Sequence, residues 1–287
     1  MAHRRTATLL TAVALLSASC GLVRIQGSPP PAGAVASGAI PNRPACAPKP
    51  VKLVFKFDAA TSPGDRDIIR DAMTKARDYF PLRYPRDPRW SYYEQRYVCY
   101  PKQYSEPVVT TMTPAEDERA AEYRVRRGIR IYLGSEGWRD SPSLARTVIT
   151  FHEAYHWFQD LAEKNPRTLA AGRDHPHWII EGSAEWASWD AAVHFGFLSS
   201  MDDARSLHAS VLVNDRSDLP RFEERTSDAF EAYPLFFTAV DALLTAHGGR
   251  EAMRTYWEFE EVKSWRVFFQ DAFEISVKKF YAEFAEG

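Results

Sequence analysis

The chain has 287 residues, of which 45% are hydrophobic and 26% are charged, and its formal net charge is −2. This is an ordinary globular composition, with enough apolar material for one large domain or two modest ones. The near-neutral charge argues against the broad basic surface typical of nucleic-acid binding, so no nucleic-acid partner is expected.

The N-terminal segment, residues 1–20, predicts a signal peptide. A basic start is followed by the apolar run Thr6–Leu16, which is too short to span a bilayer as a helix. The segment that ends in Ser19-Cys20-Gly21 resembles a bacterial lipobox, in which the cysteine becomes the lipidated first residue, although Ser17 stands where an aliphatic residue is usual. We therefore expect an exported bacterial protein, either a cell-envelope lipoprotein held at the membrane through Cys20 or a freely secreted one.

A spacer is expected next, over residues 21–49, because this stretch is rich in Pro, Gly, Ala and Ser and cannot bury enough apolar surface to order itself. The folded domain is then expected over residues 50–287. If Cys20 carries lipid, Cys46 and Cys99 remain. In an oxidising compartment they are expected to form a disulfide, and the alternative is two separate thiols.

The folded part is expected to begin with a small sheet and to continue as a helical block. Val51–Phe57 is rich in β-branched and aromatic residues and predicts a strand. Ser62-Pro63 predicts the start of a helix that runs to Tyr79. Further elements are expected as strands at Tyr93–Tyr100 and Gly128–Gly134 and as a helix at Thr113–Arg124. From Ser143 onward the pattern is mainly helical, so we predict an α+β fold with a small mixed sheet that has an edge strand.

The chemistry of the chain is concentrated first in a predicted helix at residues 143–163, which contains the string His152-Glu153-Ala154-Tyr155-His156. Residues four apart share a helix face, so His152 and His156 can reach one metal ion. Glu153 projects beside that ion, where it can take a proton from a bound water. The alternative is a core helix whose two histidines are satisfied by hydrogen bonds.

A second predicted helix, Trp178–Trp189, offers two carboxylates four residues apart, Glu181 and Glu185. Carboxylates on an otherwise apolar helix are costly to bury without partners, and a cation with its histidine ligands would be suitable partners. Glu181 can then be the third ligand, and Glu185 can accept the hydrogen bond from the far nitrogen of a ligating histidine. The alternative for Glu185 is a surface salt bridge.

Taken together, His-Glu-x-x-His followed by Trp-x-x-Glu-Gly-x-Ala-Glu resembles the gluzincin metallopeptidases over residues 144–190. The resemblance implies a zincin-like catalytic domain with Zn²⁺ as its cofactor. It also implies the roles of the matching residues: His152, His156 and Glu181 as ligands, Glu153 as general base and Glu185 as the acidic residue behind the ligands. The segment between the two motifs, 157–180, is longer than in the aminopeptidase branch, which we interpret as a different connecting loop.

Looser similarities to the same family add two expectations. An edge strand at Val125–Leu133 would align the substrate backbone by β-addition. Tyr233, at the start of a later helix, would hydrogen-bond the oxyanion, or else pack in the core.

His175 and His177 could line the cleft or substitute as ligands, although local hydrogen bonds are the commoner role of loop histidines. The remaining histidines of the folded part are expected to be structural or at the surface: His194, His208 and His247.

The function implied is that of an exported zinc-dependent peptidase, which hydrolyses a peptide or protein substrate with Glu153 as the base. Two alternatives stay open. One is a cell-envelope lipoprotein that binds zinc for a structural or partner-binding role without catalysis. The other is a lipoprotein in which the motif is a chance match and no metal binds.

Overall fold

The computed structural model describes residues 51–80, 108–112, 120–124, 128–162, 175–224, 229–258 and 264–287, and the backbone of short strands at 49–50, 83–84, 89–91 and 96–98. The expected signal peptide, the spacer as far as residue 48, and Cys20, Cys46 and Cys99 lie outside these residues. Within the part that is described, no helix combines the length and the apolar character needed to cross a membrane.

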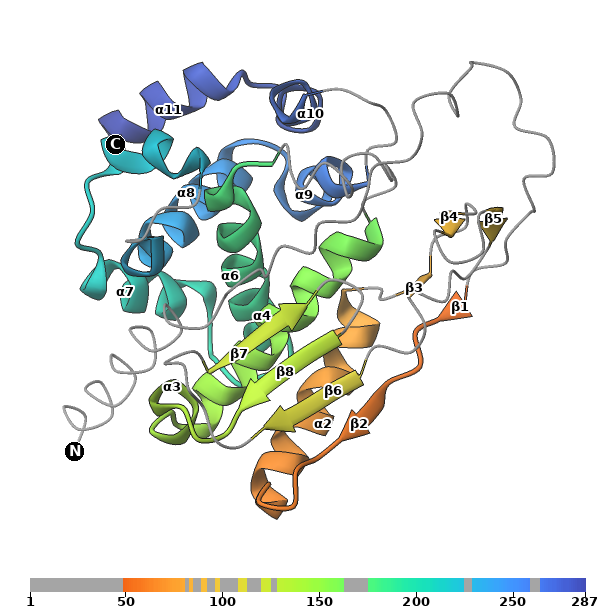
Figure 1. The fold of residues 1–287 in the computed structure, drawn as a ribbon. Coiled ribbons are helices and arrows are strands. Elements are labelled where there is room, and N and C mark those ends of the chain that lie inside the picture. Colours follow the sequence, from red (N-terminus) through yellow and green to blue (C-terminus); the bar gives the residue numbers. More distant parts are fainter. Residues whose placement is uncertain are drawn as a thin grey trace.

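The sheet has four strands in the order β2-β6-β8-β7 (Figure 1). Their bounds are β2 Val54–Lys56, β6 Val108–Met112, β7 Ala121–Arg124 and β8 Gly128–Tyr132. β2 pairs with β6 and β6 with β8 in parallel, whereas β7 is antiparallel to β8. Four short strands form two antiparallel pairs outside this sheet: β1 (Lys49–Pro50) with β3 (Arg83–Tyr84), and β4 (Arg89–Ser91) with β5 (Arg96–Val98). The sheet is therefore small and mixed, as predicted.

Two expectations about the sheet are wrong. The helix expected at Thr113–Arg124 is contradicted at its end, since Ala121–Arg124 forms strand β7. The edge strand expected at Val125–Leu133 is also contradicted, because β8 lies between β6 and β7, and the edges of the described sheet are β2 and β7. In both cases the pairing of β7 with β8 decides the outcome, and strand formation depends more on such neighbours than on local propensity.

The first residue of β8, Gly128, allows this strand to lie close beside β6 in the interior of the sheet. Gly128 has a φ of 93°, and a Cβ atom there would lie only 2.4 Å from the carbonyl oxygen of Val108 on β6. Glycine therefore allows the chain to enter close beside β6. Ile129 and Ile131 then point to the buried side of the sheet, with exposed fractions of 1% and 0%.

Three helices flank the sheet. α2 (Pro63–Tyr79) matches the predicted bounds, and the hydroxyl of Ser62 caps it by accepting from the backbone N–H of Asp65 at 3.1 Å. α3 (Glu136–Arg139) follows β8 and leads into α4 (Ser143–Ala162). α4 packs on β7 and β8, and α2 packs along α4 (Figure 1). The predicted first helix and the motif helix thus form one layer against the sheet.

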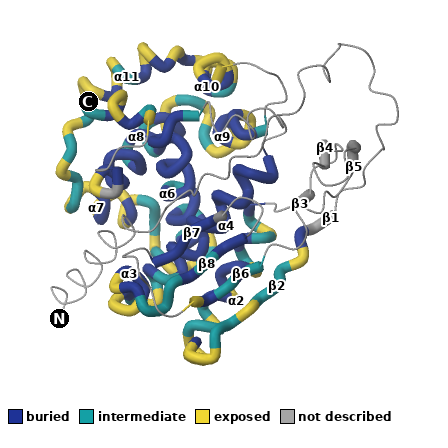
Figure 2. The backbone as a smooth tube through the Cα atoms, in the orientation of Figure 1, coloured by how far each residue is buried: buried dark blue, intermediate teal, exposed yellow. Residues whose placement is uncertain are grey.

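The rest of the chain is a helical block. Its elements are α6 (His177–His194), α7 (Met201–Val211), η2 (Arg216–Glu223), η3 (Ala229–Ala232), α8 (Tyr233–Ala246), α9 (Gly249–Trp257), α10 (Trp265–Phe273) and α11 (Val277–Glu286). α6 packs on both α4 and α8, and Figure 2 shows that these three helices form the most buried part of the molecule. A helix that is apolar on nearly all sides is expected in such a central position. The fold is α+β and mainly helical, as predicted.

Candidate metal centre

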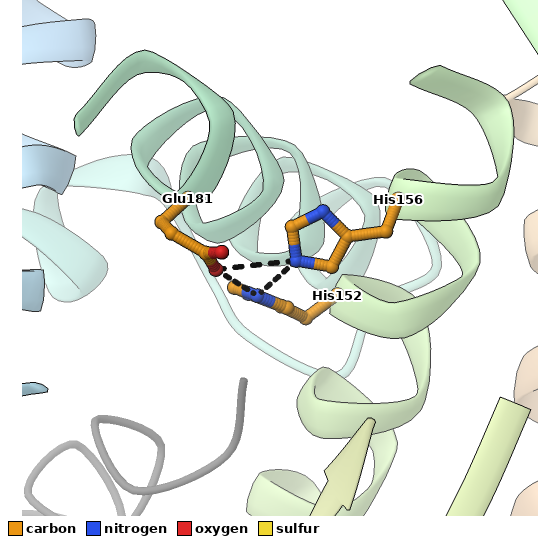
Figure 3. Close-up of side chains that lie close together, drawn as sticks. All are labelled: His152, His156 and Glu181. Atoms are coloured by element: carbon orange, nitrogen blue, oxygen red, sulfur yellow. Dashed lines mark hydrogen bonds and ion pairs between the residues drawn. The ribbon is translucent and has the colours of Figure 1, made fainter. Parts of the chain in front are cut away.

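The two predicted motifs meet where α4 crosses α6. His152 and His156 project from α4, and Glu181 projects from α6 toward both rings (Figure 3). The Oε2 atom of Glu181 lies 3.4 Å from Nε2 of His152 and 3.2 Å from Nε2 of His156. The two Nε2 atoms are 3.0 Å apart. One ligand atom from each residue lies within 4.8 Å of the others, so this buried group could hold a metal ion.

The orientation of the His152 ring is set by Glu185. Nδ1 of His152 lies 3.0 Å from Oε2 of Glu185, one turn beyond Glu181 on α6. Burial raises the pKa of Glu185, but hydrogen bonds and the nearby histidines lower it more, so the net pKa is lowered and the group is a carboxylate. An ionised carboxylate only accepts, hence Nδ1 of His152 donates, and in the neutral ring Nε2 presents a lone pair to Glu181.

The orientation of the His156 ring is set by Gln159, three residues along α4. Nδ1 of His156 lies 2.8 Å from Oε1 of Gln159. The amide nitrogen of Gln159 donates instead to the carbonyl oxygen of Ile180 and to the hydroxyl of Ser183, both at 2.9 Å. Oε1 therefore accepts from His156, and Nε2 of His156 also presents a lone pair to the centre.

With both rings neutral, the lone pairs of the two Nε2 atoms and of the Glu181 carboxylate point at one another. Because such lone pairs repel, the arrangement requires a positive charge among them. A proton can supply it: burial lowers the pKa of His152, but hydrogen bonds to Glu181 and Glu185 outweigh this effect and raise the pKa to about 10. A metal ion can supply it equally well, since imidazole nitrogen and carboxylate oxygen are ligands that proteins use for zinc and related ions. Among the described residues, Oε1 of Glu181 has no hydrogen-bond partner, which leaves a further lone pair at the centre.

Two other predicted residues lie at this centre. Glu153 is fully buried on α4, and its charge contributes to the raised pKa of His152. Tyr233, the first residue of α8, is buried, and its hydroxyl donates to Oε2 of Glu181 at 2.8 Å. Its ring lies 6.0 Å from that of His152, centroid to centroid. Tyr233 therefore reaches the ligand carboxylate itself, and its role toward an oxyanion stays a prediction.

His175, just before α6, and His177, the first residue of α6, differ in their positions. Nδ1 of His175 is hydrogen-bonded to the hydroxyl of Tyr256 at 2.6 Å, and burial lowers the pKa of His175 to about 4. His175 is thus held by a long-range hydrogen bond to α9 and not by a local one, and it is not part of the group that could hold a metal ion. His177 lies one turn before Glu181, with its Nδ1 atom 3.9 Å from Oε1 of that carboxylate. His177 therefore borders the centre without joining the ligand group.

The sequence analysis does not predict the role of Gln159. A signal for it exists, since Gln159 lies three residues after His156 and so on the same helix face.

His208 is expected from the sequence to be structural or at the surface. It lies on α7, its exposed fraction is 1%, and its Nε2 atom is 3.5 Å from Oε1 of Glu185. No spacing in the sequence links α7 to the motif helices.

Comparisons with protein-family models, with curated proteins and with solved structures gave no match. The function must therefore be inferred from the chemistry of the buried cluster and of the residues that hold it.

Proposed function

We propose that this chain is a zinc-dependent peptidase of the gluzincin type, with His152, His156 and Glu181 as the zinc ligands. The observation that carries the proposal is the convergence of their ligand atoms, which lie within 4.8 Å of one another. Glu185 and Gln159 each occupy the outer nitrogen of one imidazole, so both Nε2 atoms face the carboxylate of Glu181. This donor set and its outer hydrogen bonds suit Zn²⁺, and Glu153 stands next to it.

A zinc ion held by His152, His156 and Glu181 would supply Lewis acidity that lowers the pKa of water at the centre toward about 7. Glu153 accepts the proton of the water that attacks the peptide carbonyl, and returns it to the departing amine. Tyr233, whose hydroxyl now bonds Glu181, is close enough to the centre to donate to the carbonyl oxygen as negative charge develops there.

Strand β7 supplies a means to align the substrate. In the described sheet β7 is an edge strand paired with β8, and we propose that an extended peptide pairs along the outer side of this strand. The hydroxyl of Tyr123 on β7 donates to Oδ2 of Asp160 at 2.8 Å, one turn beyond His156 on α4. This bond fixes the edge strand relative to the helix that carries two of the ligands. The substrate is accordingly a peptide or protein in extended form.

The test is Glu153→Gln, which removes the base and keeps the shape of the side chain. We expect the variant to retain zinc and to lose about 10²- to 10⁴-fold in turnover, because it cannot accept the proton. Zinc is measured by elemental mass spectrometry and cleavage by mass spectrometry of a peptide library. Glu136→Gln, at an exposed position at the start of α3, is the matched control and should behave as the wild type. Unchanged turnover in Glu153→Gln, or a wild type without metal, would reject the proposal.

A second candidate is a zinc-binding protein without catalysis, and the burial of the cluster favours it. The exposed fraction is 0% for His152, Glu153 and Glu181 and 4% for His156, whereas an enzyme must admit its substrate. One zinc per chain with no cleavage of any library peptide by the wild type would select this candidate.

The cellular setting belongs to the same proposal. We infer export to the bacterial cell envelope with lipid on Cys20, and a disulfide between Cys46 and Cys99 that forms in the oxidising compartment. Mass spectrometry of the mature protein tests both features. An intact residue 1, or two free thiols, would contradict the corresponding inference.

A further inference from the structure

His208 lies behind the metal centre in a position that packing alone does not explain. Its ring stacks on Phe237 of α8, with centroids 3.8 Å apart and planes at 12°, and Trp189 of α6 meets it edge-on at 5.7 Å. Within the described residues neither ring nitrogen has a hydrogen-bond partner. A buried imidazole that carries an N–H group needs an acceptor, and such orphaned polar groups are rare in folded proteins.

The acceptor within reach is Glu185. Nε2 of His208 lies 3.5 Å from Oε1 of Glu185, and the other oxygen of the same carboxylate accepts from Nδ1 of His152. Oε1 already accepts from the indole N–H of Trp189 at 2.8 Å. A carboxylate oxygen has two lone pairs, so Oε1 has room for a second donor.

The charge state of His208 fits the role of a neutral donor. Burial lowers the pKa of His208 to about 4, so at neutral pH the ring carries one N–H group. The charge of Asp241 also reaches His208, but Oδ1 of Asp241 accepts from Trp186, and Arg205 contacts both of its oxygens. Glu185 is thus the carboxylate that has an oxygen available to His208.

We propose that His208 is a positioning residue of the metal centre, whose Nε2–H donates to Oε1 of Glu185 and so fixes the carboxylate that orients His152. This inference rests on the proposed zinc site. Trp189 and His208 together hold one oxygen of Glu185, so the other oxygen stays directed at Nδ1 of His152. Without His208 the carboxylate can rotate, and zinc binding must then also order the imidazole.

The test compares two substitutions at this position. His208→Phe can retain the stack on Phe237 and donates nothing, whereas His208→Gln carries an amide N–H group at a similar reach. We expect the zinc Kd of His208→Phe to rise about tenfold or more, and His208→Gln to recover most of that loss. The visible absorption spectrum of the cobalt-substituted protein should change in the Phe variant and resemble the wild type in the Gln variant. In a Glu185→Gln background the two variants should bind zinc equally.

The possible outcomes separate this inference from the proposed function. If the wild type binds no zinc, both are rejected together. If the wild type binds zinc and His208→Phe binds it equally tightly, the role of His208 alone is rejected. It is also rejected if the Phe and Gln variants are equally weakened, because packing would then explain the effect. Should His208→Phe fail to fold, as judged by circular dichroism, His208→Met provides a second variant without a donor.

Discussion

At the scale of single residues, the rings of the two candidate histidine ligands are held by chemically different acceptors. His152 donates to the ionised Glu185 on α6, whereas His156 donates to the neutral amide of Gln159 on its own helix. A carboxylate partner increases the basicity of an imidazole more than an amide does. Gln159 has an additional task, because its amide nitrogen reaches across to Ile180 on α6. His156 is therefore oriented by the same side chain that joins the two helices.

This double task of Gln159 leads to a prediction. Gln159→Leu should weaken zinc binding by about 10- to 100-fold, because the Nδ1–H group of His156 loses its acceptor and the ring is no longer fixed. Gln159→Glu keeps the acceptor and should bind zinc more nearly as the wild type does. It removes the donor to Ile180, so its free energy of unfolding should fall by about 1–3 kcal/mol. Competition with a chelating dye and urea titration measure the two effects, and wild-type zinc affinity in Gln159→Leu would contradict the assigned role.

At the scale of elements, α6 determines the centre, because it carries both carboxylates and packs between α4 and α8 (Figure 1). Gly182 lies between the two carboxylate residues Glu181 and Glu185 in the sequence, at the point where the backbones of α6 and α8 approach closely. A Cβ atom at this position would lie 2.6 Å from the carbonyl oxygen of Phe236 and 2.9 Å from Cγ2 of Val240. Glycine is therefore needed for α8 to approach α6 closely enough to bring Tyr233 to Glu181.

Gly182→Ala should accordingly separate the two helices. We expect the free energy of unfolding to fall by about 1–3 kcal/mol, as is usual for overpacking in a well-packed core. Zinc affinity should fall as well, because the bond from Tyr233 to Glu181 depends on the same approach. Gly64→Ala in α2 is the matched control, since a Cβ atom there meets only the Ser62 hydroxyl, at 3.9 Å. The control should be neutral or slightly stabilising, and equal stability of both variants in urea would contradict the explanation.

The elements that the sequence predicted well are those defined by local rules. Helix α2 could be predicted because Ser62 and Pro63 are a cap and a first-turn residue, and the meeting of His156 with Glu181 followed from helical spacing combined with ligand chemistry. The sequence could not show that β8 is interior and β7 is at the edge. This order depends on the pairing of β8 with β6, which is a separate segment earlier in the chain. His208 could not be assigned either, because its contact with Glu185 arises only when α7 packs beside α6.

At the scale of the whole molecule, acid should destabilise the fold through the partly buried His175. The ring of His175 packs against Tyr256 and Trp257 of α9, and burial lowers its pKa from 6.5 to about 4. Between these values the unfolded chain binds a proton that the folded chain does not bind. The contribution of His175 to stability is therefore complete above about pH 6.5 and is lost as the pH falls toward 4. The shift corresponds to about 3 kcal/mol.

His175→Asn tests this contribution. The asparagine amide can hydrogen-bond the hydroxyl of Tyr256, but the side chain does not titrate. The variant should be less stable at pH 7.5, because the smaller side chain leaves a cavity among aromatic rings. Its free energy of unfolding should nevertheless fall less between pH 7.5 and pH 4.5 than that of the wild type. Parallel urea titrations at the two pH values give the comparison, and identical losses would show that His175 does not account for the acid sensitivity.

Burial of the cluster His152, His156 and Glu181 affects how the resistance of the protein to proteolysis depends on zinc. An ion held by the cluster on α4 and α6 would bind the folded chain only, because the unfolded chain has no such site. By mass action, each tenfold rise in free zinc above the Kd then adds about 1.4 kcal/mol to the stability of the fold. When zinc becomes scarce, a larger share of the molecules is open to proteases, and the amount of protein falls. Under the proposed function, the zinc supply therefore sets how much of this protein survives.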